Sequence, residues 1–168
     1  AEVDVLVVGF GGAGACAALQ AAEKGASVML VERLHGGGTT SVSGGVVYLG
    51  GGTDIQRKAG FEDDAEQMYR YLRREVEEAV SPETLRHFCE TSTANHDWLA
   101  AHGVPFDASY CPFKTSYPTD DYYLYYSGNE SAAPYSSDAK PAPRGHRVKG
   151  PGLSGKPLFA ALRAAVER

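Results

Sequence analysis

Four residues near the amino end have the types and spacing of a nucleotide site. Gly9, Gly11 and Gly14 follow one apolar run, and Glu32 closes the next. Gly9 permits a sharp turn off a strand, Gly11 lets the backbone approach a diphosphate, and Gly14 lets a helix pack closely on the sheet. A diphosphate there meets the first-turn N–H groups and the positive end of the helix dipole. Glu32 can accept hydrogen bonds from ribose hydroxyls, so the pattern predicts a site for an ADP moiety.

The surroundings of Glu32 narrow the choice of ligand. A carboxylate at the ribose disfavours the 2′-phosphate of NADP, which leaves FAD or NAD. A second cluster of glycines and hydroxyl side chains follows at 36–45. NAD has no need of this cluster, whereas FAD has a ribityl chain and a flat ring still to be held. The sequence therefore favours FAD, and the alternatives are a solvated Glu32 and an ordinary flexible loop at 39–45.

The elements that must position these residues follow from periodicity. A buried strand at 5–8, an Ala-rich helix at 13–22 and a strand at 28–31 form a βαβ unit. A helix is expected from Asp64 to Val80, with an apolar stripe at Met68, Leu72, Val76 and Ala79. Another begins at Ser81 and Pro82, carries Leu85, Phe88, Ser92 and Leu99 on one face, and ends at Gly103. A last helix is expected at 158–166, so the fold class is α/β.

The middle of the chain offers weaker signals. Residues 122–126 read as a strand whose alternate tyrosines face opposite sides, with one face buried. A packed hairpin is favoured over a tyrosine-lined substrate pocket. Residues 127–143 read as a surface loop, and 144–147, Arg-Gly-His-Arg, as either a ligand-contacting segment or a solvated turn. Trp98, His96 and His102 lack the spacing and the carboxylate of a metal site, so no metal is expected.

Composition excludes several function classes. The net charge of −5 and the absence of a Lys/Arg block argue against nucleic-acid binding. No apolar run approaches eighteen residues, so no membrane span is expected. Three cysteines without C-x-x-C spacing support neither a disulfide framework nor a zinc site. A reducing cytoplasm is therefore the expected location.

The motifs GFGGAG, VERLHGGG and TTSVSGGVVYLGGGT together resemble the N-terminal part of the fumarate reductase and succinate dehydrogenase flavoprotein superfamily. The last motif is similar to that of flavin-dependent 3-ketosteroid dehydrogenases, particularly those acting at the 4,5 bond of 5α-steroids. The resemblance implies a Rossmann-like FAD-binding domain with a doubly wound parallel sheet, with the family's cap domain mostly absent from this chain.

The resemblance also implies which residues hold the cofactor. A covalent flavin needs a His where this chain has Gly38, and His35 lies three residues too early, so FAD is expected to bind without a covalent bond. The backbone of residues 43–45 is expected near the flavin N5 edge. The full set of expected cofactor residues is Gly9, Gly11, Gly12, Ala13, Gly14, Glu32, Arg33, Thr39, Thr40, Ser41, Ser43, Gly44 and Gly45.

Four parts of the FAD-binding domain are expected within residues 1–168. They are a βαβ unit at 1–35, a flavin-contacting loop at 36–53, a helical and Tyr-rich insert at 54–143 and a return segment at 144–168. The expected reaction is hydride transfer between flavin and a carbon near a carbonyl, with an apolar ketone such as a 3-ketosteroid as substrate. Catalytic residues are expected beyond Arg168. The alternatives are a fumarate or urocanate type of reductase, and a fragment that is inactive until it meets the rest of the protein or a companion chain.

Overall fold

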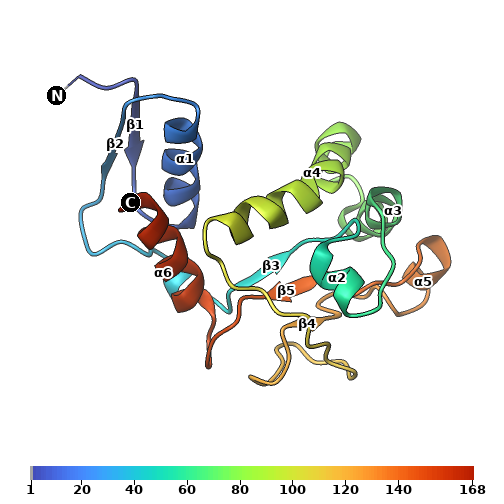
Figure 1. The fold of residues 1–168 in the computed structure, drawn as a ribbon. Helices are drawn as coiled ribbons and strands as arrows, with labels where there is room; N and C mark the ends of the chain where they lie inside the picture. The colour runs from blue at the N-terminus through green and yellow to red at the C-terminus, as the bar shows by residue number, and fades with distance from the viewer. Residues whose placement is uncertain (1) are drawn as a thin grey trace.

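The computed structural model describes residues 2–168, whose elements form two groups (Figure 1). One group holds a parallel strand pair and two helices, and the other holds a three-stranded sheet with the remaining helices. In chain order the elements are β1 (Val5–Val8), α1 (Gly12–Glu23), β2 (Val28–Val31), the 3-10 turn η1 (Thr40–Val42), β3 (Val46–Tyr48), α2 (Asp54–Lys58), α3 (Ala65–Val76), α4 (Pro82–Ala101), β4 (Leu124–Tyr125), α5 (Tyr135–Asp138), β5 (Gly145–Arg147) and α6 (Gly155–Val166).

The βαβ unit is confirmed. β1 and β2 pair in parallel, from Val5 opposite Val28 to Val8 opposite Val31, and α1 connects them. The strand buries Val7, while Leu6 and Val8 are 58% and 79% exposed on the opposite face. α6 packs beside α1 and closes this core. Residues 2–168 thus supply two strands of the expected parallel sheet and leave one of its faces uncovered.

The second sheet is antiparallel, with the strand order β3-β5-β4. α3 and α4 pack on each other beside it, around a separate core that includes Met68, Leu72 and Cys89. No helix in residues 2–168 combines the length and apolar character needed to cross a bilayer. The molecule therefore has two cores, and the chain passes between them in the segments from β2 to β3 and from β5 to α6 (Figure 1).

The ends of the long helices follow local signals. Asp64 caps α3 by accepting the Gln67 N–H at 2.7 Å, and Ser81 caps α4 through the Thr84 N–H. Gly103, at φ +88°, follows α4 as predicted. α3 stops earlier than expected, at Val76, because Glu77 turns to φ +50° and leaves Ala79 exposed.

The apolar face of α4 differs from the prediction at one position. Phe88 is 37% exposed, and Cys89 is buried in its place. The buried positions Leu85, Cys89, Ser92 and His96 are spaced by four, three and four residues, which keeps them on one helix face. The sequence pattern predicted a buried Phe88, whereas the buried residue is the next one, Cys89.

The predicted alternation at residues 122–126 is wrong. Tyr123, Leu124 and Tyr125 are all buried, so both faces of this segment are covered. On one face the Arg147 guanidinium lies 5.0 Å from the centre of the Tyr123 ring. The edges of β4 pair with β5 and with a bridge to Tyr110. β4 pairs with β5, about twenty residues later, so the predicted packed hairpin within this segment does not form. The surface-loop prediction for 127–143 is also wrong at Glu130 and near its end, which are buried.

The solvated-turn interpretation of residues 144–147 is wrong as well. Arg144, His146 and Arg147 are at most 1% exposed, because β5 is the central strand of its sheet. His146 lies with one ring nitrogen 2.8 Å from Thr53 Oγ1 and the other 3.1 Å from the Arg144 carbonyl oxygen. Burial away from water lowers the pKa of His146 to about 4.

This burial predicts a pH-dependent stability. Between about pH 6.5 and pH 4 the unfolded chain takes up a proton on His146 and the folded chain does not, so stability is highest above pH 6.5 and falls with acidification. The contribution is about 3 kcal/mol. Urea unfolding of His146→Gln should lack this part of the decline, whereas exposed His35→Gln should retain it. Parallel curves for wild type and His146→Gln would contradict the prediction.

Candidate functional site

The glycine turn between β1 and α1 has the conformation that its sequence predicts. Gly9 adopts φ +100°, a region that residues with a side chain rarely enter. A Cβ at Gly14 would lie 1.9 Å from the Gly9 carbonyl oxygen. The helix can therefore start this close to the strand only because position 14 carries no side chain.

Unpaired N–H groups lie at the start of α1 and in the segment before η1. Within residues 2–168, the N–H groups of Ala13, Gly14 and Thr39 donate to no acceptor. Thr40 Oγ1 accepts the Gly12 N–H at 3.1 Å and so joins the second glycine cluster to the helix. Such free N–H groups at a helix N-terminus form a binding site for an anion.

Glu32 lies at the end of β2 beside this turn. Its Oε2 accepts the Phe10 N–H at 2.7 Å, and its Oε1 accepts the Leu34 N–H at 2.9 Å. The Phe10 N–H is the main cause of a lowered pKa for Glu32, so the carboxylate is ionised at neutral pH. A hollow of about 410 Å³ opens here, lined by Val8, Gly9, Val31, Glu32 and Arg33. The side chain thus fixes the turn and keeps lone pairs for hydroxyl donors.

The segment 39–45 is held by several contacts and is not the flexible loop considered as an alternative. Ser41 Oγ donates to the Gly38 carbonyl oxygen at 3.1 Å, and the Ser43 carbonyl oxygen accepts the Gly155 N–H at 3.0 Å. Gly45 adopts φ +61°, and a Cβ there would meet Ser154 at 2.2 Å. The start of α6 therefore fixes the carboxyl end of this segment.

One residue important to this arrangement, Tyr117, was not predicted from sequence. Tyr117 Oη donates to the Gly44 carbonyl oxygen at 2.9 Å, and the Nε–H of Arg147 donates to Tyr117 Oη at 2.9 Å. The sequence singled out Arg147 within a cationic segment but gave no signal for Tyr117, which lies 73 residues from its partner Gly44. The contact depends on tertiary structure alone.

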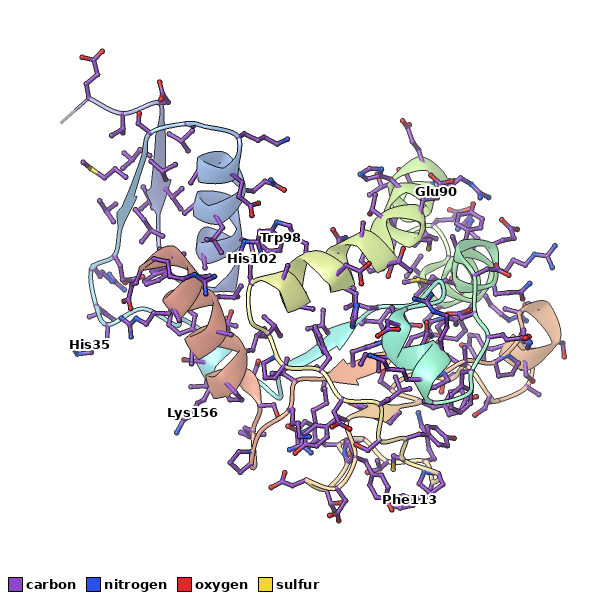
Figure 2. The ribbon with its side chains drawn as sticks, in the orientation of Figure 1. His35, Glu90, Trp98, His102, Phe113 and Lys156 are labelled. Carbon is purple, nitrogen blue, oxygen red and sulfur yellow. The ribbon has the colours of Figure 1, made fainter. Side chains whose placement is uncertain are left out.

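The histidines near Trp98 serve packing. Trp98 and His102 lie at the carboxyl end of α4 beside α1 (Figure 2), with their rings 4.0 Å apart. Both contact Glu23, at 2.9 Å from Trp98 Nε1 and 3.0 Å from His102 Nε2. His96 instead packs on Phe106 and His146. Residues 2–168 contain no group of three metal-ligating side chains.

The predicted residues for a dinucleotide are therefore brought together, and the geometry fits FAD. The turn offers free N–H donors, Glu32 offers an acceptor, and the segment 39–45 lies directly beside Gly12. Gly38 has no side chain that could form a covalent bond, and His35 is exposed at the edge of the molecule (Figure 2). The site can bind and orient a cofactor.

The chain is similar to solved and curated proteins over a part of their length. The chain is 48% identical over 163 residues to the 3-oxo-5-alpha-steroid 4-dehydrogenase of Comamonas testosteroni, covering 95% of this chain and 31% of that protein. It is 39% identical over 103 residues to the NADH:fumarate oxidoreductase of Klebsiella pneumoniae, covering 60% of this chain and 11% of that protein. The crystal structure of the 3-ketosteroid-delta4-(5alpha)-dehydrogenase from Rhodococcus jostii RHA1, in complex with 4-androstene-3,17-dione, superposes with a TM-score of 0.92 at 38% identity, covering 99% of this chain and 36% of that chain.

The chain spans at most about a third of the length of these proteins. The family model described as "FAD binding domain" matches residues 4–157, which include the glycine turn, Glu32 and the segment 39–45. The chain therefore belongs to the FAD binding domain family, and its cofactor is FAD.

Proposed function

We propose that the thirteen residues predicted from sequence hold FAD without a covalent bond. The N–H groups of Ala13, Gly14 and Thr39 bind the diphosphate, because they have no other acceptor in residues 2–168. Glu32 accepts from the ribose hydroxyls beside Arg33, and residues 43–45 line the flavin. The set comprises Gly9, Gly11, Gly12, Ala13, Gly14, Glu32, Arg33, Thr39, Thr40, Ser41, Ser43, Gly44 and Gly45.

We further propose that the whole protein is an FAD-dependent oxidoreductase acting on the 4,5 bond of a 3-ketosteroid. The similarity to two steroid 4-dehydrogenases along nearly the whole chain supports this. The arginines support it independently. A fumarate-type substrate needs free Arg side chains for its carboxylates. Arg144 is bound to Asp63 and Arg147 to Asp120, so this close pair offers no carboxylate clamp.

The reaction divides between cofactor and protein. A bound FAD would supply a hydride acceptor, and a base that takes the proton from the neighbouring carbon would complete formation of a C=C bond next to the carbonyl. The residues of this chain bind the adenylate, set the flavin against the backbone of residues 43–45 and exclude water there. The proton-transferring groups belong to the rest of the protein or to a companion chain. Cytoplasmic location is part of the proposal and is supported by three free cysteines.

Anaerobic titration of the purified full-length protein tests the substrate class. We expect a yellow protein whose absorbance is bleached by a saturated 5α-3-ketosteroid and not by succinate. Acid precipitation should release the flavin into the supernatant. Bleaching by succinate alone would replace the steroid proposal with the fumarate type, and flavin retained in the pellet would contradict non-covalent binding.

Removing the Glu32 carboxylate should weaken FAD binding. A hydrogen bond to a charged group contributes about 1.5–3 kcal/mol, so Glu32→Ala should raise the Kd for FAD roughly 10- to 100-fold. Fluorescence titration of the apoprotein measures this change. Glu2→Ala, at an exposed position outside the site, is the matched control and should leave the Kd unchanged. Equal affinities for wild type and Glu32→Ala would remove Glu32 from the site.

A further inference from the structure

The buried side chain of Arg147 makes several hydrogen bonds next to the segment 39–45. Arg147 is fully buried, and its Nη1 donates to the Thr119 carbonyl oxygen at 2.7 Å, its Nη2 to the Gly152 carbonyl oxygen at 2.7 Å. Its Nε donates to Tyr117 Oη and lies 3.1 Å from Ser154 Oγ. The guanidinium carbon also lies 4.7 Å from the centre of the Tyr117 ring. The Arg147 guanidinium thus connects the loop at Thr119 and the loop at Gly152 to the ring and hydroxyl of Tyr117.

Tyr117, which Arg147 holds in place, in turn contacts Gly44. Its hydroxyl accepts from Arg147 Nε and from the Ser154 N–H at 3.2 Å, which leaves its single proton for a carbonyl. The carbonyl oxygens of Gly44 and Gly152 both lie 2.9 Å away. The ring also packs directly on Gly44, where a Cβ would lie 2.9 Å from Tyr117 Cε2. The hydroxyl and the ring edge together fix one peptide group.

The peptide on the other side of Gly44 is fixed as well. The Ser43 carbonyl oxygen accepts the Gly155 N–H at 3.0 Å. In a trans peptide the N–H points opposite to the carbonyl, so the Gly44 N–H is directed away from α6. Within residues 2–168 this N–H donates to no acceptor. A partly buried donor with a fixed direction is therefore left for a ligand.

We propose that Tyr117, held by Arg147, is a positioning residue that aims the Gly44 N–H at the flavin ring and thereby raises the flavin reduction potential. This rests on the proposed function, in which residues 43–45 line the flavin. Reduction adds negative charge to the ring, and a fixed N–H dipole stabilises that charge without reorganising. Loss of the hydroxyl removes the hydrogen bond to the Gly44 carbonyl oxygen and leaves the Gly44–Gly45 peptide with the weaker contact from the Gly45 N–H to Ser43 Oγ at 3.2 Å. Because glycine has few conformational limits, residue 44 then holds the direction of its N–H less tightly.

Tyr117→Phe in the full-length holoenzyme tests the inference. It retains the ring and removes only the hydroxyl. We expect near-stoichiometric FAD, with reduced FAD bound about tenfold more weakly relative to oxidised FAD than in wild type. For a two-electron couple this is a fall of about 30 mV in the flavin potential. Tyr125→Phe is the matched control, since its hydroxyl makes only a 3.5 Å contact, and its potential should equal that of wild type.

A second variant covers the case in which Tyr117→Phe does not fold. Gly44→Ala keeps the hydroxyl, but its methyl group must displace the Tyr117 ring, so the potential should fall in the same direction. An FAD-loaded Tyr117→Phe or Gly44→Ala protein with the wild-type potential would overturn the positioning role. A wild-type protein that binds no FAD would instead overturn the proposed function, so the two failures are distinct.

Discussion

Gly14→Ala is expected to lose FAD. The added Cβ would lie 1.9 Å from the Gly9 carbonyl oxygen and 3.1 Å from the Gly9 carbonyl carbon. Both atoms are backbone, so no side-chain rotation relieves the overlap, and α1 must move off the sheet. Overpacking of this kind costs about 1–3 kcal/mol of stability. Misdirecting two N–H donors to a charged diphosphate costs about 3 kcal/mol or more of binding free energy, or roughly 100-fold in Kd.

Substitutions at two further glycines distinguish an effect on FAD affinity from an effect on the stability of the fold. Gly25→Ala has open space around its Cβ but a φ of +86°, so it should lose about 1–2 kcal/mol of stability and keep its FAD. Gly11→Ala has neither strain nor a contact closer than 3.9 Å, so the apoprotein should be as stable as wild type. Its methyl group should still weaken FAD binding, because the diphosphate passes there. FAD affinity and thermal unfolding measure the two effects. Wild-type affinity in Gly14→Ala would contradict this account of the turn.

The parts of the fold that could be predicted depend on residues close together in the sequence. The turn at Gly9, the cap at Ser81 and the stop at Gly103 each need only a few neighbouring residues. Glu32 could be predicted for the same reason, because the βαβ unit fixes its distance from the glycine turn. These local signals were sufficient to predict the glycine turn and the carboxylate beside it.

The parts that could not be predicted depend on strands that meet across long separations. β5 pairs with β3 about a hundred residues earlier and with β4 on its other side, and His96 and Phe106 pack on the ring of His146. A cationic segment with that composition is usually solvated, and the sequence does not show that Asp63 and Asp120 meet its two arginines. The contact between Tyr117 and Gly44 is of the same kind, since no local signal links Tyr117 to a glycine 73 residues earlier.

Arg144→Met is expected to be among the most destabilising substitutions in this chain. Arg144 forms two parallel hydrogen bonds to Asp63, at 2.9 Å from Nε and 2.7 Å from Nη2, and both side chains are fully buried. Asp63 also accepts from the Gly51 N–H and Gln56 Nε2. Removing the guanidinium leaves a buried carboxylate without its countercharge, which costs about 3–5 kcal/mol. Urea unfolding at neutral pH measures this loss.

Two comparisons test whether the uncompensated charge is the cause. Adding Asp63→Asn to Arg144→Met removes the charge while retaining an acceptor for the Gly51 N–H, so the double variant should be more stable than Arg144→Met alone. Arg70→Met breaks an exposed pair with Glu66 and should cost at most about 1 kcal/mol. If the double variant is less stable than Arg144→Met, the loss comes from packing and hydrogen bonds around Asp63 rather than from its buried charge.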